Sequence, residues 1–175
     1  MESLLRCRKF EVVRELVSGK DGKSHMREYV MHPGAVVILP LLNDDECLVL
    51  RQFRPAVDQT IWELPAGTLD VPGESPEAAA ARELEEETGH RAERLERLCE
   101  FFPSPGVLSE RIIVFVATRL TEAKQKLGPT EQILGVERVR IADLYTMIRD
   151  GRIADGKTIL TLLRWDMEKR ARLPH

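Results

Sequence analysis

The stretch that decides the fold begins with Trp62-Glu63-Leu64-Pro65-Ala66-Gly67, continues through a loop with Glu74 and ends with Arg82-Glu83-Leu84-Glu85-Glu86-Glu87-Thr88-Gly89. Its first part predicts the end of a strand, and residues 76–88 predict a helix. Ser75 can cap this helix, Pro76 suits its first turn, and Gly89 stands where helices commonly stop. The stretch therefore predicts a strand, a loop and a helix rich in acidic side chains.

Three glutamates share one face of this predicted helix. Glu83, Glu86 and Glu87 stand at i, i+3 and i+4, so their side chains lie within an arc of about 100°. Repulsion between like charges at this spacing lowers helix stability by a few tenths of a kcal/mol per pair. The helix dipole also disfavours anions in the C-terminal half of the helix, where these glutamates lie. We therefore expect a cation nearby, and such oxygen ligands suit Mg²⁺, with Mn²⁺ possible. A short acidic run alone is also typical of a solvated helix face.

Neighbouring residues extend this candidate site. Glu74 adds a fourth carboxylate just before the helix, and Arg82 can orient a glutamate or balance the charge. Gly67 and Gly73 frame a loop that can bring the backbone close to a ligand or a metal. The spacing of the whole set favours a metal–diphosphate site over a solvated face.

The arrangement resembles the Nudix box, a family signature in which a glycine, a glutamate and then R-E-hydrophobic-x-E-E-x-G occur at near-fixed distances. Two positions depart from it: six residues rather than five separate Gly67 from Glu74, and His90 takes the usual aliphatic place after Gly89. The extra residue falls in a loop, where insertions are best tolerated, so it affects the path of the loop more than the helix. The resemblance implies a Nudix-type α/β/α sandwich with a mixed sheet.

Outside the box the chain resembles the ADP-ribose pyrophosphatase group. The likeness rests on Arg51-Gln52-Phe53-Arg54-Pro55, on residues 62–67 and on Ser104-Pro105-Gly106, where Pro105 lies sixteen residues past Gly89. It implies metal-dependent hydrolysis of a diphosphate bridge, with ADP-ribose as substrate and AMP and ribose 5-phosphate as products. The alternatives are a nucleotide sugar, NADH, a dinucleoside polyphosphate or an oxidised nucleotide as substrate, and, from another class, a nucleotide sensor without turnover.

The same resemblance implies a set of metal ligands. The Ala66 carbonyl, Glu83 and Glu87 would bind the metal directly, Glu86 would be an additional or alternating ligand, and Glu74 would support the site.

It also implies substrate contacts. Arg51, Arg54, Glu63 and Pro105 would lie around the substrate: Arg54 would contact the diphosphate or the terminal ribose, and Glu63 would accept hydrogen bonds from the ligand. Arg27 would help to enclose the nucleotide across a homodimer. A surface salt bridge for Arg54 and a structural carboxylate for Glu63 are the open alternatives.

A general base is the last role that the resemblance implies. Related enzymes often place a catalytic glutamate on a loop, and Glu131 in the turn 128–132 is the candidate. A glutamate of the box could act instead, and Glu131 could equally be an ordinary loop residue.

The rest of the chain alternates strands and helices. A hairpin is predicted within residues 1–32, which we expect to form a small β extension on a hydrolase domain of residues 33–175 and to take part in a dimer. Strands interleaved with a few helices predict an α/β class. The predicted strands are 10–17, 26–30, 34–42, 47–53, 111–118 and 136–141, and the further helices are 142–149 and 157–172. The inner face of the last helix is predicted to comprise Ile159, Leu160, Leu162, Leu163 and Met167.

Composition excludes several classes of protein. The chain has 175 residues, 43% of them hydrophobic and 31% charged, which is typical of one globular domain. A net charge of −3 predicts no nucleic-acid partner, and no apolar run approaches the roughly 20 residues of a membrane span. Without a secretion-like start or paired cysteines, we expect a cytoplasmic protein with reduced thiols and no transition-metal site.

Overall fold

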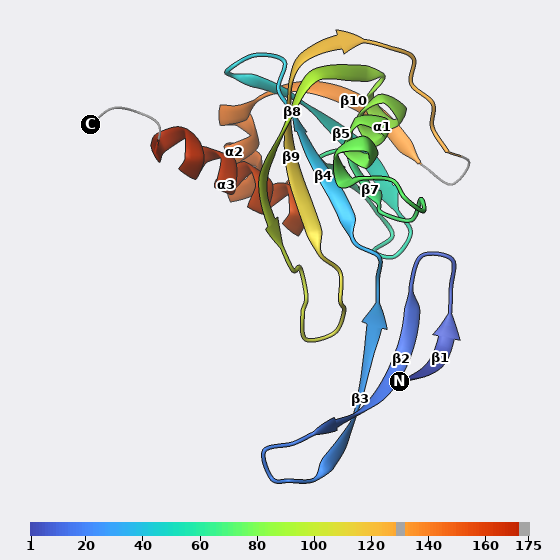
Figure 1. The fold of residues 1–175 in the computed structure, drawn as a ribbon. Helices are drawn as coiled ribbons and strands as arrows, with labels where there is room; N and C mark the ends of the chain where they lie inside the picture. Colours follow the sequence, from blue (N-terminus) through green and yellow to red (C-terminus); the bar gives the residue numbers. More distant parts are fainter. Residues whose placement is uncertain (129–131, 172–175) are drawn as a thin grey trace.

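The computed structural model describes residues 1–128 and 132–171. Its first strands form a separate antiparallel sheet in the order β1-β2-β3, with β1 at Glu2–Arg6, β2 at Glu11–Ser18 and β3 at Ser24–Met31. This N-terminal sheet projects from the rest of the molecule (Figure 1). The hairpin β2–β3 matches the predicted one, whereas β1 was not predicted because all five of its side chains are exposed and give no burial pattern.

A mixed four-stranded sheet, in the order β7-β4-β9-β8, forms the centre of the fold. All six residues of β4 (Ala35–Pro40) are buried, which fits a predicted core strand. It pairs in parallel with β9 (Ile112–Glu122) and antiparallel with β7 (Ala66–Thr68). At the edge, β8 (His90–Phe101) was not predicted, because its charged residues face solvent on an edge strand and hide the apolar alternation.

A second three-stranded sheet has the order β10-β5-β6. It consists of β5 (Glu46–Arg54), β6 (Gln59–Glu63) and β10 (Ile133–Arg140), all antiparallel. The single strand predicted to end in residues 62–67 is corrected here: β6 and β7 belong to different sheets. Pro65, which has no amide hydrogen for a ladder, lies between them, and its carbonyl accepts from the Ile38 amide at 2.9 Å.

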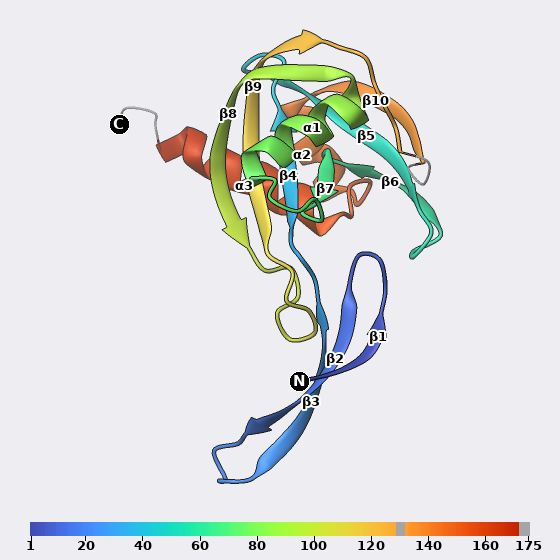
Figure 2. The same ribbon diagram turned by 45° about the vertical axis from the view of Figure 1, so that its right-hand side comes forward.

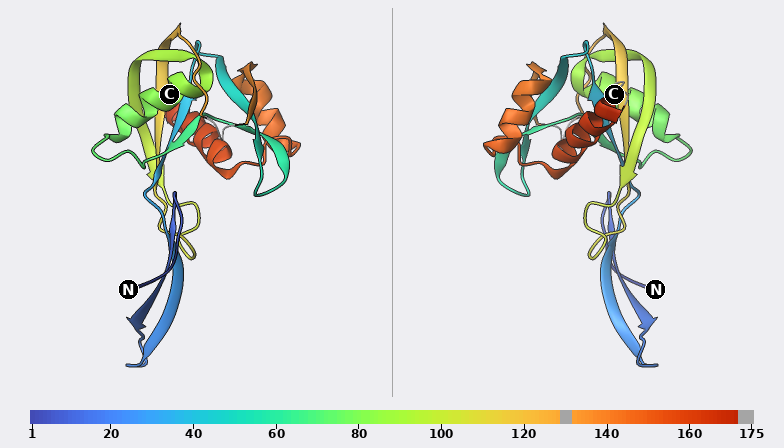
Figure 3. Two further views of the ribbon diagram at one scale, coloured as in Figure 1. Left: turned by 90° about the vertical axis from the view of Figure 1, so that its right-hand side faces the viewer. Right: turned by 90° about the vertical axis from the view of Figure 1, so that its left-hand side faces the viewer.

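Helices cover both faces of the central sheet (Figures 2 and 3). Helix α1 (Pro76–Thr88) packs on one face, while α2 (Ile141–Arg149) and α3 (Gly156–Ala171) lie on the other. Alternate residues of β4 supply the two cores, with Val36 and Ile38 towards α1 and Val37 and Leu39 towards α2 and α3. The predicted α/β/α sandwich with a mixed sheet is confirmed.

The ends of α1 follow from its sequence. The Ser75 hydroxyl accepts from the Ala78 amide at 3.1 Å, and Gly89 adopts a left-handed φ of 68° where the helix stops. Leu84 is fully buried on its inner face, and burial of such a side chain stabilises the fold by about 1.5–3 kcal/mol. The bounds agree with the predicted helix, so the acidic face is placed as expected.

The inner face of α3 differs from the prediction. Leu163 and Met167 are 47% and 62% exposed, whereas Thr158, Thr161 and Leu162 are buried. The predicted face was therefore wrong for its two outer members, because two threonines rather than apolar residues occupy the packed side. The end of the predicted helix at Arg172 lies outside the described residues.

No helix in the described part of the chain is both long and apolar enough to cross a membrane.

Candidate active site

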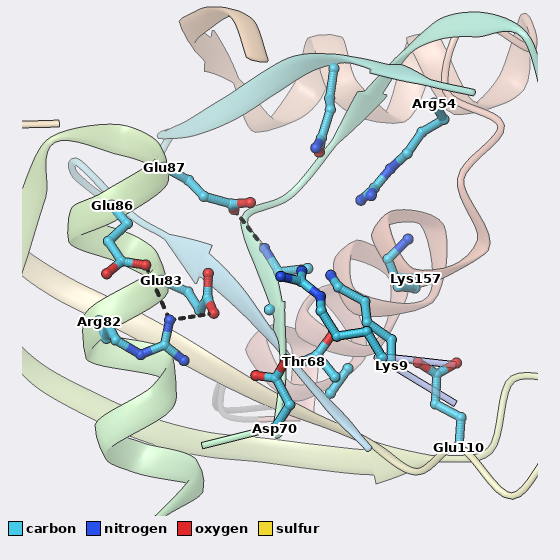
Figure 4. A pocket seen from close by; sticks show the side chains of 15 residues that line it. Lys9, Arg54, Thr68, Asp70, Arg82, Glu83, Glu86, Glu87, Glu110 and Lys157 are labelled. Atoms are coloured by element: carbon cyan, nitrogen blue, oxygen red, sulfur yellow. Dashed lines mark hydrogen bonds and ion pairs between the residues drawn. The ribbon is translucent and has the colours of Figure 1, made fainter. Parts of the chain in front are cut away.

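A cleft of about 400 Å³ lies beside α1. It brings together six of the predicted site residues: Arg54, Ala66, Arg82, Glu83, Glu86 and Glu87. One wall carries the acidic side chains of α1, and the opposite wall carries Arg54 and Lys157 (Figure 4). Ala66, Gly67 and Thr68 of β7 also line the cleft. Strand β7, helix α1 and the end of β5 therefore position the site.

Arg82 supplies one positive charge to the acidic helix face. Its Nε and Nη2 donate to the two carboxylate oxygens of Glu74 at 2.9 and 3.0 Å. Its Nη1 donates to Glu83 Oε1 at 2.6 Å and to Glu86 Oε2 at 3.1 Å (Figure 4). The hydrogen bond from Arg82 lowers the pKa of Glu74, and that same bond raises the pKa of Arg82. Arg82 thus links the loop carboxylate to the helix carboxylates.

Strand β7 closely approaches two of the glutamates. The Ala66 amide donates to Glu87 Oε2 at 2.9 Å, and both Glu83 and Glu87 are buried. A Cβ on Gly67 would lie 1.9 Å from the Glu83 carboxyl carbon, so only glycine fits beside that carboxylate. The backbone of β7 and the acidic face of α1 are therefore in direct contact.

On the opposite wall, Arg54 forms a bidentate ion pair with Glu63. The Arg54 Nε and Nη2 donate to the two Glu63 oxygens at 2.6 and 2.7 Å, and the pairing raises the pKa of Arg54. Glu63 is fully buried, and Lys157 Nζ also donates to it at 3.2 Å. The structure thus places Glu63 behind two cleft cations, and its direct contact with a ligand stays a prediction.

Four of the five residues predicted to contact the substrate do not line the cleft: the buried Glu63, and also Arg27, Arg51 and Pro105. Arg51 lies over the Trp62 ring at 5.8 Å, and Arg27 lies exposed on β3 of the N-terminal sheet. Pro105 is in an exposed loop that hydrogen-bonds to the end of the same sheet. The predicted base Glu131 lies outside the described residues.

The sequence reasoning missed further residues of the cleft. Gln52 lies two residues before Arg54 on β5, so the period of two in strands could have placed both on one wall. Lys157 comes from the start of α3, and no sequence pattern connects it with Glu63. The other missed residues are Arg8, Lys9, Ala35, Thr68, Asp70 and Glu110.

A divalent cation fits the acidic wall by the chemistry of its donors. In residues 1–128 and 132–171, no three His, Cys, Asp or Glu side chains form a ready-made metal centre. Mg²⁺ does not require one, because it keeps several waters and shares one or two carboxylates with substrate phosphates. Glu83, Glu86 and Glu87 offer oxygen donors only, and they line the cleft together. The wall therefore suits such a cation when a phosphate-bearing ligand is present.

Comparison with known proteins decides the family. The family model of the NUDIX domain matches residues 31–162. The chain belongs to the Nudix family. The matched region contains β7, α1 and both walls of the cleft, but it excludes nearly all of the N-terminal sheet.

Two relatives of this Nudix protein that match most of its length carry different names. An ADP-ribose pyrophosphatase of Bacillus subtilis (strain 168) is 36% identical over 159 residues, which are 90% of this chain and 85% of the relative. A methanol dehydrogenase activator of Bacillus methanolicus is 35% identical over 143 residues, or 81% of this chain and 77% of the relative.

A solved structure agrees in fold. A crystal structure of an ADP compounds hydrolase superposes with a TM-score of 0.84 at 23% identity, covering 98% of this chain and 92% of that one. At this identity the likeness shows the fold, which includes the mixed sheet and its helices.

Proposed function

We propose that this Nudix protein hydrolyses the diphosphate bridge of ADP-ribose to AMP and ribose 5-phosphate. One observation carries the proposal: the three box glutamates face Arg54 and Lys157 across a single cleft. An anionic diphosphate with a metal ion on one side and cations on the other matches these two walls. The name of the Bacillus subtilis relative supports the choice of substrate.

Glu83, Glu87 and the Ala66 carbonyl would hold the metal, with Glu86 as an additional ligand. Nudix hydrolases generally use a divalent metal, and we propose Mg²⁺ here, with Mn²⁺ as the alternative. When bound, such an ion neutralises the charge that develops on the diphosphate as the bridge breaks. Arg82 holds both oxygens of Glu74, so we assign Glu74 the task of fixing Arg82.

The side chains of the cleft would orient the substrate and handle the proton. The Arg54 guanidinium, fixed by Glu63, would donate to the diphosphate or to the terminal ribose. Glu86 is the most exposed of the three box glutamates, so it can accept a proton from the attacking water; Glu131 is the alternative base. Holding water and phosphorus in one orientation supplies much of the catalysis.

We also propose a homodimer built on the N-terminal sheet. This sheet exposes several apolar side chains, which a second copy would cover: Leu4, Leu5, Leu16, Val17 and Met26. Arg27, which lies away from its own cleft, would then serve the cleft of the neighbouring subunit. Light scattering that gave the mass of a monomer at assay concentration, with full activity, would remove this proposal. A cytoplasmic location stays a prediction.

A panel of substrates tests the proposed specificity. Among ADP-ribose, NADH, a nucleotide sugar, a dinucleoside polyphosphate and a deoxynucleoside triphosphate, we expect ADP-ribose to have the highest kcat/KM. If Arg54 serves the terminal ribose, Arg54→Ala should reduce kcat/KM for ADP-ribose far more than for the triphosphate, which lacks that group. A preference of tenfold or more for another compound, about 1.4 kcal/mol in transition-state stabilisation, would overturn the specificity.

A further inference from the structure

Lys157 belongs to a network of four charges that the Nudix box does not include. Its Nζ donates to Asp155 Oδ1 at 2.6 Å and to the buried Glu63 at 3.2 Å. Glu63 in turn holds Arg54 through two short hydrogen bonds. Two cations and two carboxylates therefore balance, and both cations line the cleft.

The start of α3 fixes this network to the strand that leads into the box. Asp155 Oδ2 accepts from the Thr158 amide at 2.9 Å and from the Thr158 hydroxyl at 2.7 Å. The same hydroxyl accepts from the Leu64 amide at 2.9 Å, next to Glu63. Thr158 is buried, so these bonds are shielded from water. Asp155 therefore caps the helix and at the same time holds Lys157 against the cleft.

Glu63 does not depend on Lys157 for its hydrogen bonds. Arg54 already donates to both oxygens of that carboxylate at 2.6 and 2.7 Å, and the contact from Lys157 is longer. An ammonium group has three donors, and two of them are used by Asp155 and Glu63. The Lys157 side chain remains 24% exposed and lies beside Arg54 in the cleft (Figure 4). Within residues 1–128 and 132–171 the ammonium group hydrogen-bonds to these two carboxylates alone, so one donor is available to a ligand.

We infer that Lys157 is a substrate-binding residue whose third donor contacts an unesterified oxygen of the diphosphate, opposite the acidic wall, and that Asp155 is its positioning residue. The inference rests on the proposed function for the class of substrate. Because Lys157 is held by two carboxylates before the ligand arrives, little side-chain entropy is lost on binding.

The test measures binding as well as turnover. Lys157→Met keeps most of the side-chain length but removes the charge and the donors. We expect the dissociation constant of imidodiphosphate, a non-hydrolysable diphosphate, to rise at least about tenfold by calorimetry with Mg²⁺ present. KM for ADP-ribose should rise similarly, with a smaller change in kcat. Lys157→Arg should recover much of the affinity, since it restores a cationic donor.

Two further variants separate binding from structure. Asp155→Asn keeps a good capping residue but removes the charge that holds Lys157, so it should weaken imidodiphosphate binding severalfold without lowering the thermal midpoint much. Lys169→Met, on the same helix, is the matched control; Lys169 contacts the Asp44 carbonyl outside the cleft, and its loss should leave binding unchanged.

The outcomes also separate this inference from the proposed function. If Lys157→Met and Asp155→Asn both bind imidodiphosphate within twofold of the wild type, Lys157 has only a structural role and the inference is wrong. Weaker binding in a protein that does not cleave ADP-ribose would support the inference and overturn the function. If the protein cleaves ADP-ribose but these variants bind imidodiphosphate as the wild type does, the proposed function is supported and the inference is overturned.

Discussion

Glu83→Gln and Glu87→Gln are each expected to lower the turnover of ADP-ribose by at least about 100-fold. Each change removes one negative charge from the wall that would hold the metal, while the shape of the side chain is kept. In Glu87→Gln the side-chain amide oxygen can still accept from the Ala66 amide, which donates to Glu87 at 2.9 Å, so the packing of β7 on α1 should persist. Steady-state kinetics at several Mg²⁺ concentrations check this expectation.

A glutamate on the same helix is the matched control. Glu77 lies in the first turn of α1, is exposed and does not line the cleft. Glu77→Gln should keep kcat close to the wild type, with at most a few tenths of a kcal/mol of lost helix stability. Near-wild-type rates for both Glu83→Gln and Glu87→Gln at saturating Mg²⁺ would refute the metal assignment.

Gly67→Ala should lower the turnover of ADP-ribose by a similar factor, for a steric reason. A Cβ at residue 67 would lie 1.9–2.2 Å from the carboxyl carbon, Oε1 and Cγ of Glu83. The Glu83 side chain can move away, so the protein should fold, but its carboxylate would leave its place beside β7. A displacement of about 1 Å in such a site can cost about 100-fold in rate.

Gly73→Ala is a useful comparison, because Gly73 lies in the loop between β7 and α1, has a left-handed φ of 79°, and an added Cβ there would meet nothing within 4 Å. It should lose some stability through backbone strain, while kcat should stay nearer the wild type. Equal kcat values for Gly67→Ala and the wild type would show that the position of Glu83 does not matter for turnover.

The sequence was most informative where local rules act. The capped helix Pro76–Thr88 and the buried strand Ala35–Pro40 were predictable because capping residues and continuous apolar runs are local signals. Strand β8 was not predicted because an edge strand with many exposed charges has no clear periodicity of apolar residues. The packed face of α3 was predicted incorrectly because Thr161, a polar residue, is fully buried in it.

In the candidate site, the acidic wall was predictable and the cationic wall only partly so. The glutamates of α1 share a face at a spacing that the helix repeat determines. Lys157, by contrast, meets Glu63 across 94 residues of sequence, and only the packing of α3 brings them together. Burial of Glu63 was the missing information, since a buried carboxylate requires cationic partners.

The most direct test of the central claim is the incubation of purified protein with ADP-ribose in the presence of Mg²⁺ or of EDTA, followed by separation of the products. We expect AMP and ribose 5-phosphate to appear in equal amounts with Mg²⁺, and cleavage to stop when the metal is chelated. Intact ADP-ribose under both conditions, or cleavage that continues at full rate in EDTA, would contradict the proposed metal-dependent hydrolysis.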